Sequence, residues 1–165
     1  MGISAPTPIT RDHDLTLFDC GYDSLNLWLK KKALKNEASG ASRSFVVCQG
    51  NTVIGYYALA SGAVAHTEAP GNIRRNMPEP IPVMVLGRLA VCNQWKGHRI
   101  GSGMLKDAVQ RTLAVAQHIG VRALLVHALS EDAKQFYMRL GFHPSPANDM
   151  TLMVTLHEAK KALQA

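Results

Sequence analysis

The feature that most constrains the fold is a strand, a glycine-rich segment, a helix and a second strand in direct succession between residues 82 and 129. The stretch PVMVLGRLAVC is mostly apolar and rich in β-branched residues, which predicts a buried strand over residues 82–92. VRALLVHAL, residues 121–129, predicts a second. Strands joined through a helix pair in parallel, so we expect an α/β protein whose mixed sheet contains one parallel crossover.

The connecting helix is predicted over residues 103–120 by apolar residues at helical spacing. Gly120 is expected to end it, because glycine favours the backbone that terminates helices. The residues expected on its buried face are Leu105, Ala108, Val109, Leu113 and Ala116.

Upstream, residues 23–38 predict an amphipathic helix that Asp23 or Ser24 caps. Its apolar face comprises Leu25, Trp28, Leu29 and Ala33, and its other face carries a run of lysines. Residues 43–49 and 52–60 read as two strands, which the turn Gly50-Asn51 joins as a hairpin. Residues 66–82 are rich in Pro, Gly and Asn, which predicts a long loop.

Near the end of the chain, residues 130–141 predict a short helix with Ser130 as its N-cap and Gly141 as its stop. Residues 150–156 predict a last strand. No repeat and no long linker interrupts the 165 residues, so we expect a single domain over residues 1–165.

Charge is unevenly distributed along the chain, whose formal net charge is +6 and whose pI is about 9.4. Residues 24–106 contain eleven lysines and arginines against three glutamates, a net of +8. Clustered bases favour a polyanionic partner, and an ordinary solvated basic surface is the equally open alternative.

Several classes are disfavoured by what the sequence lacks. No apolar run reaches the roughly 18 residues of a membrane span, so no membrane partner is expected. The start has neither a secretory signal nor a myristoylation pattern, since Pro6 stands where Ser or Thr is required, and we expect a cytoplasmic protein. The cysteines Cys20, Cys48 and Cys92 are widely separated, so they are expected to be reduced thiols, and no metal site is expected.

The glycine-rich segment NQWKGHRIGSGML predicts an anion site, because a helix N-terminus offers unpaired N–H groups and glycines allow close approach. Its glycines stand at positions 97, 101 and 103. Neither a nucleotide P-loop nor a dinucleotide fingerprint fits that spacing. A basic turn with no ligand is the alternative.

A third pattern nearly fits. Gln94-Trp95-Lys96-Gly97-His98-Arg99-Ile100-Gly101 resembles the Q/R-x-x-G-x-G/A pyrophosphate loop of the GNAT superfamily, the acyl-CoA-dependent N-acetyltransferases. Gln94 and Gly97 match, whereas Arg99 stands where Gly or Ala is usual. EDAKQFYMRLGF resembles the A-x-x-F-Y-x-x-x-G-F element of the same superfamily, with matches at Ala133, Phe136, Tyr137, Gly141 and Phe142.

Residues 18–143 further resemble the TacT-type toxins of bacterial type II toxin–antitoxin pairs, chiefly in residues 23–38, 71–91 and 120–142. The resemblance implies the GNAT fold, a mixed and mostly antiparallel sheet with a splayed parallel pair, flanked by helices. It also implies an enzyme that acetylates the α-amine of aminoacyl-tRNA from acetyl-CoA and so blocks translation. The implied partners are charged tRNA, a ribbon-helix-helix antitoxin and a second copy of the chain in a homodimer. DNA would be contacted only through the antitoxin, in a repressor complex.

The same resemblance assigns roles to residues. A backbone amide of Leu89, Ala90 or Val91 is expected to bind the thioester oxygen, and Tyr137 to protonate the leaving thiolate. Leu129 and Phe136 are expected along the pantetheine. The pyrophosphate is expected on Lys96, Gly97, His98, Arg99, Ile100, Gly101 and Ser102.

The tRNA is expected to bind the bases Lys30, Lys31, Lys32, Lys35, Arg74 and Arg75. Two other functions stay open at this point. One is a GNAT enzyme that acetylates a small amine or a protein N-terminus, and the other is a non-catalytic RNA-binding domain with the same fold. The sequence does not indicate which aminoacyl-tRNA would be preferred.

Overall fold

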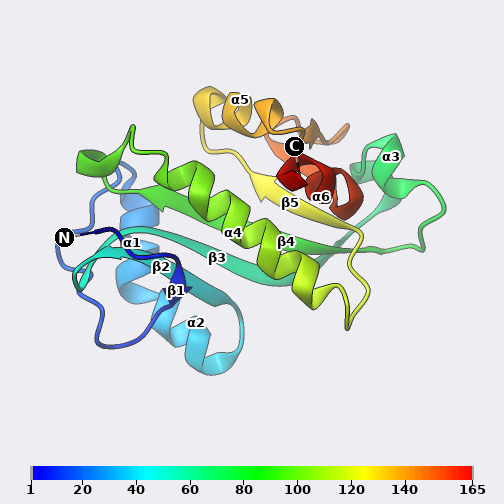
Figure 1. Cartoon of the computed structure of the whole chain (residues 1–165). Coiled ribbons are helices and arrows are strands. Elements are labelled where there is room, and N and C mark those ends of the chain that lie inside the picture. The colour runs from blue at the N-terminus through cyan, green and yellow to red at the C-terminus, as the bar shows by residue number, and fades with distance from the viewer. Residues whose placement is uncertain (1, 165) are drawn as a thin grey trace. The chain divides into compact units, whose positions relative to one another are not determined.

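The computed structural model describes residues 2–164 and contains one seven-stranded mixed sheet flanked by helices (Figure 1). The strand order is β1-β2-β3-β4-β5-β7-β6, and β4 and β5 are parallel. This confirms the predicted fold class. The strands are β1 Thr7–Pro8, β2 Arg43–Gln49, β3 Thr52–Val64, β4 Ile81–Val91, β5 Ala123–His127, β6 His143–Pro144 and β7 Thr151–Thr155.

The three expected helices are present, the first of them divided into α1 and α2, and two further helices, α3 and α6, were not expected. The described chain forms two compact units: one holds the residues up to Ala60 with Arg88–Ala108, and the other holds Ser61–Gly87 and the residues from Val109 on. That the whole chain is a single domain stays a prediction. The helices are α1 Asp23–Lys31, α2 Ala33–Ser39, α3 Gly71–Arg74, α4 Ile100–Val115, α5 Glu131–Arg139 and α6 Leu156–Gln164, with short 3-10 helices η1 His66–Glu68 and η2 Asn93–Trp95.

In the first unit, the predicted hairpin is confirmed. β2 and β3 pair antiparallel, and Gly50 makes the turn with a φ of 62°. The single helix expected over residues 23–38 is wrong in one respect, because Lys32 interrupts it between α1 and α2. Leu25, Leu29 and Ala33 are buried as expected.

The predicted cap of the first helix is also wrong. Tyr22 occupies the N-cap position and caps with no side chain, so neither Asp23 nor Ser24 serves. The preceding turn is held instead by Asp19 and Asn26, whose side chains bond each other at 3.0 Å. The Asn26 side-chain oxygen also accepts from the Cys20 N–H at 2.9 Å. Asn26 therefore fixes the turn before the helix rather than capping the first N–H groups of α1.

The connecting helix α4 begins at Ile100 and ends at Val115, so the predicted stop at Gly120 is wrong. Beyond Val115 the chain tightens into turns, in which the His118 N–H donates to the Val115 carbonyl at 3.0 Å. Ala114 and Val115 are already exposed. The helix ends where its buried face ends, since packing rather than propensity sustains most helices.

In the second unit, β4 pairs with β5 from Val83–Ala123 to Leu86–Val126, and β5 pairs antiparallel with β7. β4 itself continues to Val91, and the splay implied beyond Leu86 stays a prediction. The predicted cap and stop of α5 are confirmed: Ser130 Oγ accepts from the Ala133 N–H at 3.1 Å, and Gly141 has a φ of 97°.

The segment predicted as a plain loop, residues 66–82, is more ordered than expected. It contains η1 and α3, and Ile73 of α3 is completely buried. A cluster of apolar side chains fixes it to the sheet, namely Val64, Ala69, Ile73, Ile81, Val83, Ala123, Leu125 and Met153.

The C-terminal helix α6, which the sequence analysis missed, starts with a capping box. Thr155 Oγ1 accepts from the Glu158 N–H at 3.0 Å, and Glu158 Oε1 accepts from the Thr155 N–H at 3.1 Å. The same carboxylate accepts from Asn72 Nδ2 of α3 at 2.9 Å and from His143 Nε2 at 3.1 Å. Burial alone would raise the pKa of Glu158, but the hydrogen bonds from His143 and Thr155 hold it below its ordinary value.

The three cysteines are buried free thiols. In the part of the chain that the structure describes, no helix is both long and apolar enough to cross a membrane. Among residues 2–164, no group of three His, Cys, Asp or Glu side chains is placed to hold a metal ion.

Candidate functional site

The glycine-rich segment forms a tight turn directly before α4, and most of its residues are exposed. After η2, the backbone passes through the left-handed region twice, at Gly97 with φ 86° and at Arg99 with φ 61°. The Gly103 N–H donates to the Arg99 carbonyl at 3.1 Å and so closes the first helical turn. The amides of Ile100, Gly101 and Ser102 lie within that turn, where a helix offers N–H groups and the positive end of its dipole. The segment therefore has the backbone of an anion site.

The side chains of this turn are not all available to a ligand. Lys96 Nζ donates to the Cys20 carbonyl at 2.9 Å, and His98 Nδ1 lies 3.1 Å from the Trp95 carbonyl. Ile100 is buried, and a Cβ on Gly55 of β3 would lie only 3.3 Å from its Cγ2 atom. Arg99 is exposed. The Ile100 side chain and one donor of the Lys96 amine are thus engaged within the protein. That a pyrophosphate binds the backbone amides and the Arg99 guanidinium stays a prediction.

The strand segment expected to bind the thioester lies beside this turn within the same unit. A Cβ built on Gly101 would meet Leu89 Cδ2 at 3.8 Å and Val91 Cγ2 at 3.9 Å. Ala90 is buried, whereas Leu89 and Val91 are partly exposed. The structure therefore brings Leu89, Val91 and the first turn of α4 together.

Tyr137 belongs to the second unit and is 6% exposed. Its ring makes edge contacts with Phe136 and Phe142, whose ring centroids lie 5.2 and 5.4 Å away. Burial raises the pKa of the Tyr137 phenol to about 12. In the same unit Phe136 is partly buried, and Leu129 is 54% exposed just before the cap of α5. The phenol is thus held by packing and is fully protonated near neutral pH.

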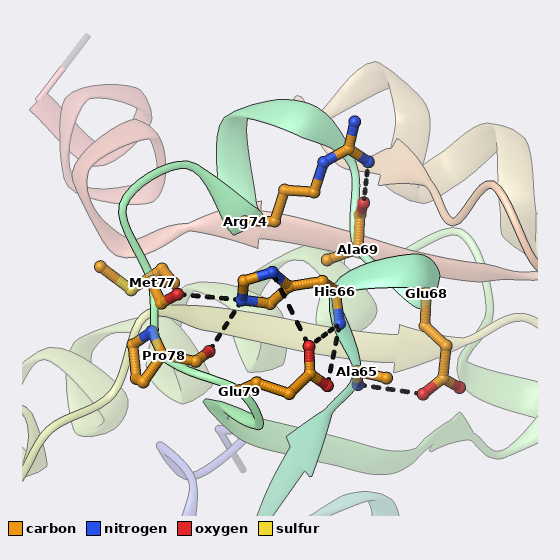
Figure 2. Close-up of polar contacts among 8 residues, drawn as sticks. All are labelled: Ala65, His66, Glu68, Ala69, Arg74, Met77, Pro78 and Glu79. Atoms are coloured by element: carbon orange, nitrogen blue, oxygen red, sulfur yellow. Dashed lines mark hydrogen bonds and ion pairs between the residues drawn. The ribbon is translucent and has the colours of Figure 1, made fainter.

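Figure 2 shows the hydrogen bonds that join the two ends of residues 65–79, the segment that carries the predicted Arg74 and Arg75. His66 Nε2 lies 2.9 Å from the carbonyl oxygens of both Met77 and Pro78. The His66 N–H donates to the Glu79 carboxylate at 3.0 Å. Arg74 Nη1 donates to the Ala69 carbonyl at 3.0 Å, so part of its guanidinium is already engaged.

A third arginine, missed by the sequence analysis, anchors the same segment. Arg122 Nε donates to the Ile73 carbonyl at 3.0 Å and Arg122 Nη2 to the Asn72 carbonyl at 2.9 Å. Arg75 is exposed beside this anchored turn. The four predicted lysines, Lys30, Lys31, Lys32 and Lys35, are all exposed at α1, α2 and the break between them. They form a basic face in the first unit, whereas the arginines belong to the second.

Comparisons with known proteins identify the family of the chain. A family model described as an acetyltransferase (GNAT) domain matches residues 40–144. A Mycobacterium tuberculosis protein named tRNA-acetylating toxin is 47% identical over 159 residues, which cover 96% of each chain. The structure of AtaT complexed with acetyl-methionyl-tRNAfMet is 26% identical with a TM-score of 0.90, over 98% of this chain and 99% of that one.

A second solved structure contains a mutated toxin, a segment of its antitoxin and acetyl-CoA. It is a Tyr-to-Phe mutant of the AtaT toxin bound to the C-terminus of the antitoxin AtaR and to acetyl-CoA. It is 26% identical with a TM-score of 0.85, over 100% of both chains.

Proposed function

Since the chain belongs to the GNAT family of acetyltransferases, we propose that it is a toxin that transfers acetyl from acetyl-CoA to the α-amine of aminoacyl-tRNA. The observation that carries this proposal is the 47% identity to a tRNA-acetylating toxin over 96% of both chains. The basic face at α1 and α2 and the exposed Arg75 suit a polyanionic substrate. N-acetylation removes the amine that peptide elongation needs, so translation would stop.

Acetyl-CoA would bind along β4 and at the start of α4. The pyrophosphate would accept hydrogen bonds from the amides of residues 97–102, with a further contact from the exposed Arg99 guanidinium. An amide of Leu89, Ala90 or Val91 would donate to the thioester oxygen as it gains negative charge. Leu129 and Phe136 would line the pantetheine.

The attacking amine needs little help from the enzyme. An α-amine has a pKa of roughly 7.7–8.0, and esterification of the neighbouring carboxylate lowers it further. Much of the substrate is therefore neutral at physiological pH. A general base is not required for attack.

The leaving thiolate would take its proton through Tyr137. A phenol with a pKa of about 12 stays protonated, as an acid must. That pKa lies roughly three units above the pKa of a free thiol, so the phenol would not protonate a finished thiolate by itself. We infer a relay: as the C–N bond forms and the C–S bond breaks, the phenol proton moves to sulfur and the proton lost by the amine replaces it. The solved structure of a Tyr-to-Phe mutant of AtaT with acetyl-CoA is consistent with a catalytic tyrosine in this family.

On the tRNA side, the phosphates would contact Lys30, Lys31, Lys32, Lys35, Arg74 and Arg75. Arg75 is exposed, whereas the Arg74 guanidinium already donates to the Ala69 carbonyl. We further propose a cytoplasmic homodimer that a ribbon-helix-helix antitoxin neutralises, with DNA contacted only through that antitoxin. The AtaR complex supports an antitoxin partner of this general kind.

The experiment that tests the proposal uses total charged tRNA, labelled acetyl-CoA and the purified protein. Mild base then releases the amino acids, which mass spectrometry identifies. We expect N-acetyl amino acids from charged tRNA and none from deacylated tRNA. Label that appears only on polyamines or on protein N-termini would favour the small-amine alternative. No transfer, together with no acetyl-CoA binding, would favour a non-catalytic domain.

A further inference from the structure

The guanidinium of Arg88, in β4, lies over an aromatic ring, and within the described residues it forms no hydrogen bond or ion pair. Its Cζ atom lies 4.4 Å from the centroid of the Trp28 ring. Arg88 is partly buried, and among residues 2–164 no carboxylate pairs with it and no acceptor bonds it. A guanidinium carries five N–H donors. Because Arg88 is only partly buried, an external acceptor such as a phosphate oxygen could reach some of them.

Aromatic side chains of the core hold Trp28 in place. Its ring stacks on Tyr56 of β3, with centroids 6.0 Å apart and planes inclined by 5°. The Tyr56 O–H donates to the Leu25 carbonyl at 2.7 Å, one helical turn before Trp28. Phe18 packs edge-on to Tyr56 at 5.5 Å. Trp28 and Arg88 therefore form a pair of contacting side chains supported by Tyr56, the Trp28–Arg88 platform.

Arg88 lies near the C-terminal end of β4. Arg88 directly precedes Leu89–Val91, which would bind the thioester. The pyrophosphate turn starts beyond Cys92, about 13 Å further along an extended strand at roughly 3.3 Å per residue. The nucleotide of CoA would therefore lie away from Arg88. Lys30 and Lys31, on the same helix as Trp28, are exposed cations that suit an incoming RNA backbone.

We propose that Arg88 and Trp28 bind the unpaired 3′-terminal nucleotide of the charged tRNA. The base stacks on the guanidinium, while the guanidinium edge donates to the adjoining phosphate. Proteins recognise single-stranded RNA ends in this way, because every base offers a stacking face. The assignment rests on the proposed function and extends it: the platform would bring the esterified α-amine to the acetyl group on the neighbouring strand residues.

One test combines a change in the protein with a change in the substrate. Charged tRNA with a normal 3′ end is compared with charged tRNA whose terminal ribose lacks its base, using wild type and Arg88→Lys. Lysine keeps the positive charge but lacks the planar guanidinium group on which a base can stack. Arg43→Lys is the matched control, since Arg43 already pairs with Glu37 at 3.5 Å.

In wild type and in Arg43→Lys, removing the base should lower kcat/KM by roughly 5- to 150-fold, the range for one stacked base. In Arg88→Lys it should change kcat/KM by less than about twofold, because the stacking partner is already lost. Acetyl-CoA affinity should be equal in all three proteins. An equal loss on base removal in wild type and Arg88→Lys would overturn the proposal.

A binding measurement separates this inference from the proposed function. The chain has two tryptophans, so Trp95→Phe leaves Trp28 as the only tryptophan emitter. Titration with an uncharged oligonucleotide that ends in CCA should quench that emission, and adding Arg88→Lys should weaken the binding. Quenching by CoA and not by RNA would overturn the assignment. If wild type failed to acetylate charged tRNA yet Trp28 responded to the RNA, the proposed function alone would fail.

Discussion

Replacing Arg99 by glycine should make the protein more stable while lowering its affinity for acetyl-CoA. Arg99 has a φ of 61°, a conformation in which a Cβ atom is unfavourable by about 1–2 kcal/mol. Glycine removes that strain but gives the unfolded chain about 0.4–1 kcal/mol more conformational freedom. The net effect is a gain of about 0.5–1 kcal/mol in the free energy of unfolding. For a chain of this length it corresponds to a rise in Tm of about 1–4 °C.

The effect on the cofactor should have the opposite sign. Arg99 is exposed at the start of α4, where we expect its guanidinium to contact a phosphate. A hydrogen bond to a charged group contributes about 1.5–3 kcal/mol, so acetyl-CoA should bind roughly 10- to 150-fold more weakly to Arg99→Gly. Thermal unfolding without ligand and calorimetric titration with acetyl-CoA measure the two effects separately.

Arg99→Ala is the matched control, because it also loses the guanidinium but keeps the Cβ atom. It should lose the same affinity and unfold at or below the wild-type Tm. Equal Tm values for the glycine and alanine variants would refute the argument from backbone strain. Unchanged acetyl-CoA affinity in both would remove Arg99 from the cofactor site.

Three further predictions concern the turn, the basic surface and the acid. Gly97→Asp should abolish acetyl-CoA binding in calorimetry, and Gly97→Ala, strained equally at φ 86° but uncharged, should lose much less. Arg74→Ala with Arg75→Ala should weaken tRNA use and flatten its dependence on salt, with acetyl-CoA affinity retained; an unchanged salt slope would exclude both. The pKa of Tyr137 is raised to about 12, so kcat should show no alkaline loss up to pH 10, and a fall near pH 9 would point to another acid.

The parts of the fold that the sequence predicted are those with strong local signals. The hairpin at Gly50, the cap at Ser130 and the stop at Gly141 depend on residues adjacent in the chain. The turn before α4 was likewise marked by its own glycines. Its second left-handed residue, however, is Arg99, so the position that departs from the family pattern still adopts the backbone that glycine favours.

The features that the sequence did not predict depend on tertiary contacts, with one exception that has a local sequence signal. The order in residues 66–80 comes from Arg122 and from Glu158, both distant in sequence. The pairing of Arg88 with Trp28 also joins residues far apart. The helix α6 could have been found, since Thr155 and Glu158 have the spacing of a capping box.

The measurement that tests the central claim most directly is a single turnover of wild type and Tyr137→Phe on one charged tRNA with saturating acetyl-CoA. The variant keeps the ring that packs on Phe136 and Phe142, so both substrates should still bind. Wild type should place acetyl on the α-amine, and the variant should do so roughly 10²–10⁴-fold more slowly, the usual contribution of a general acid. Acetylation by Tyr137→Phe at the wild-type rate would contradict the account.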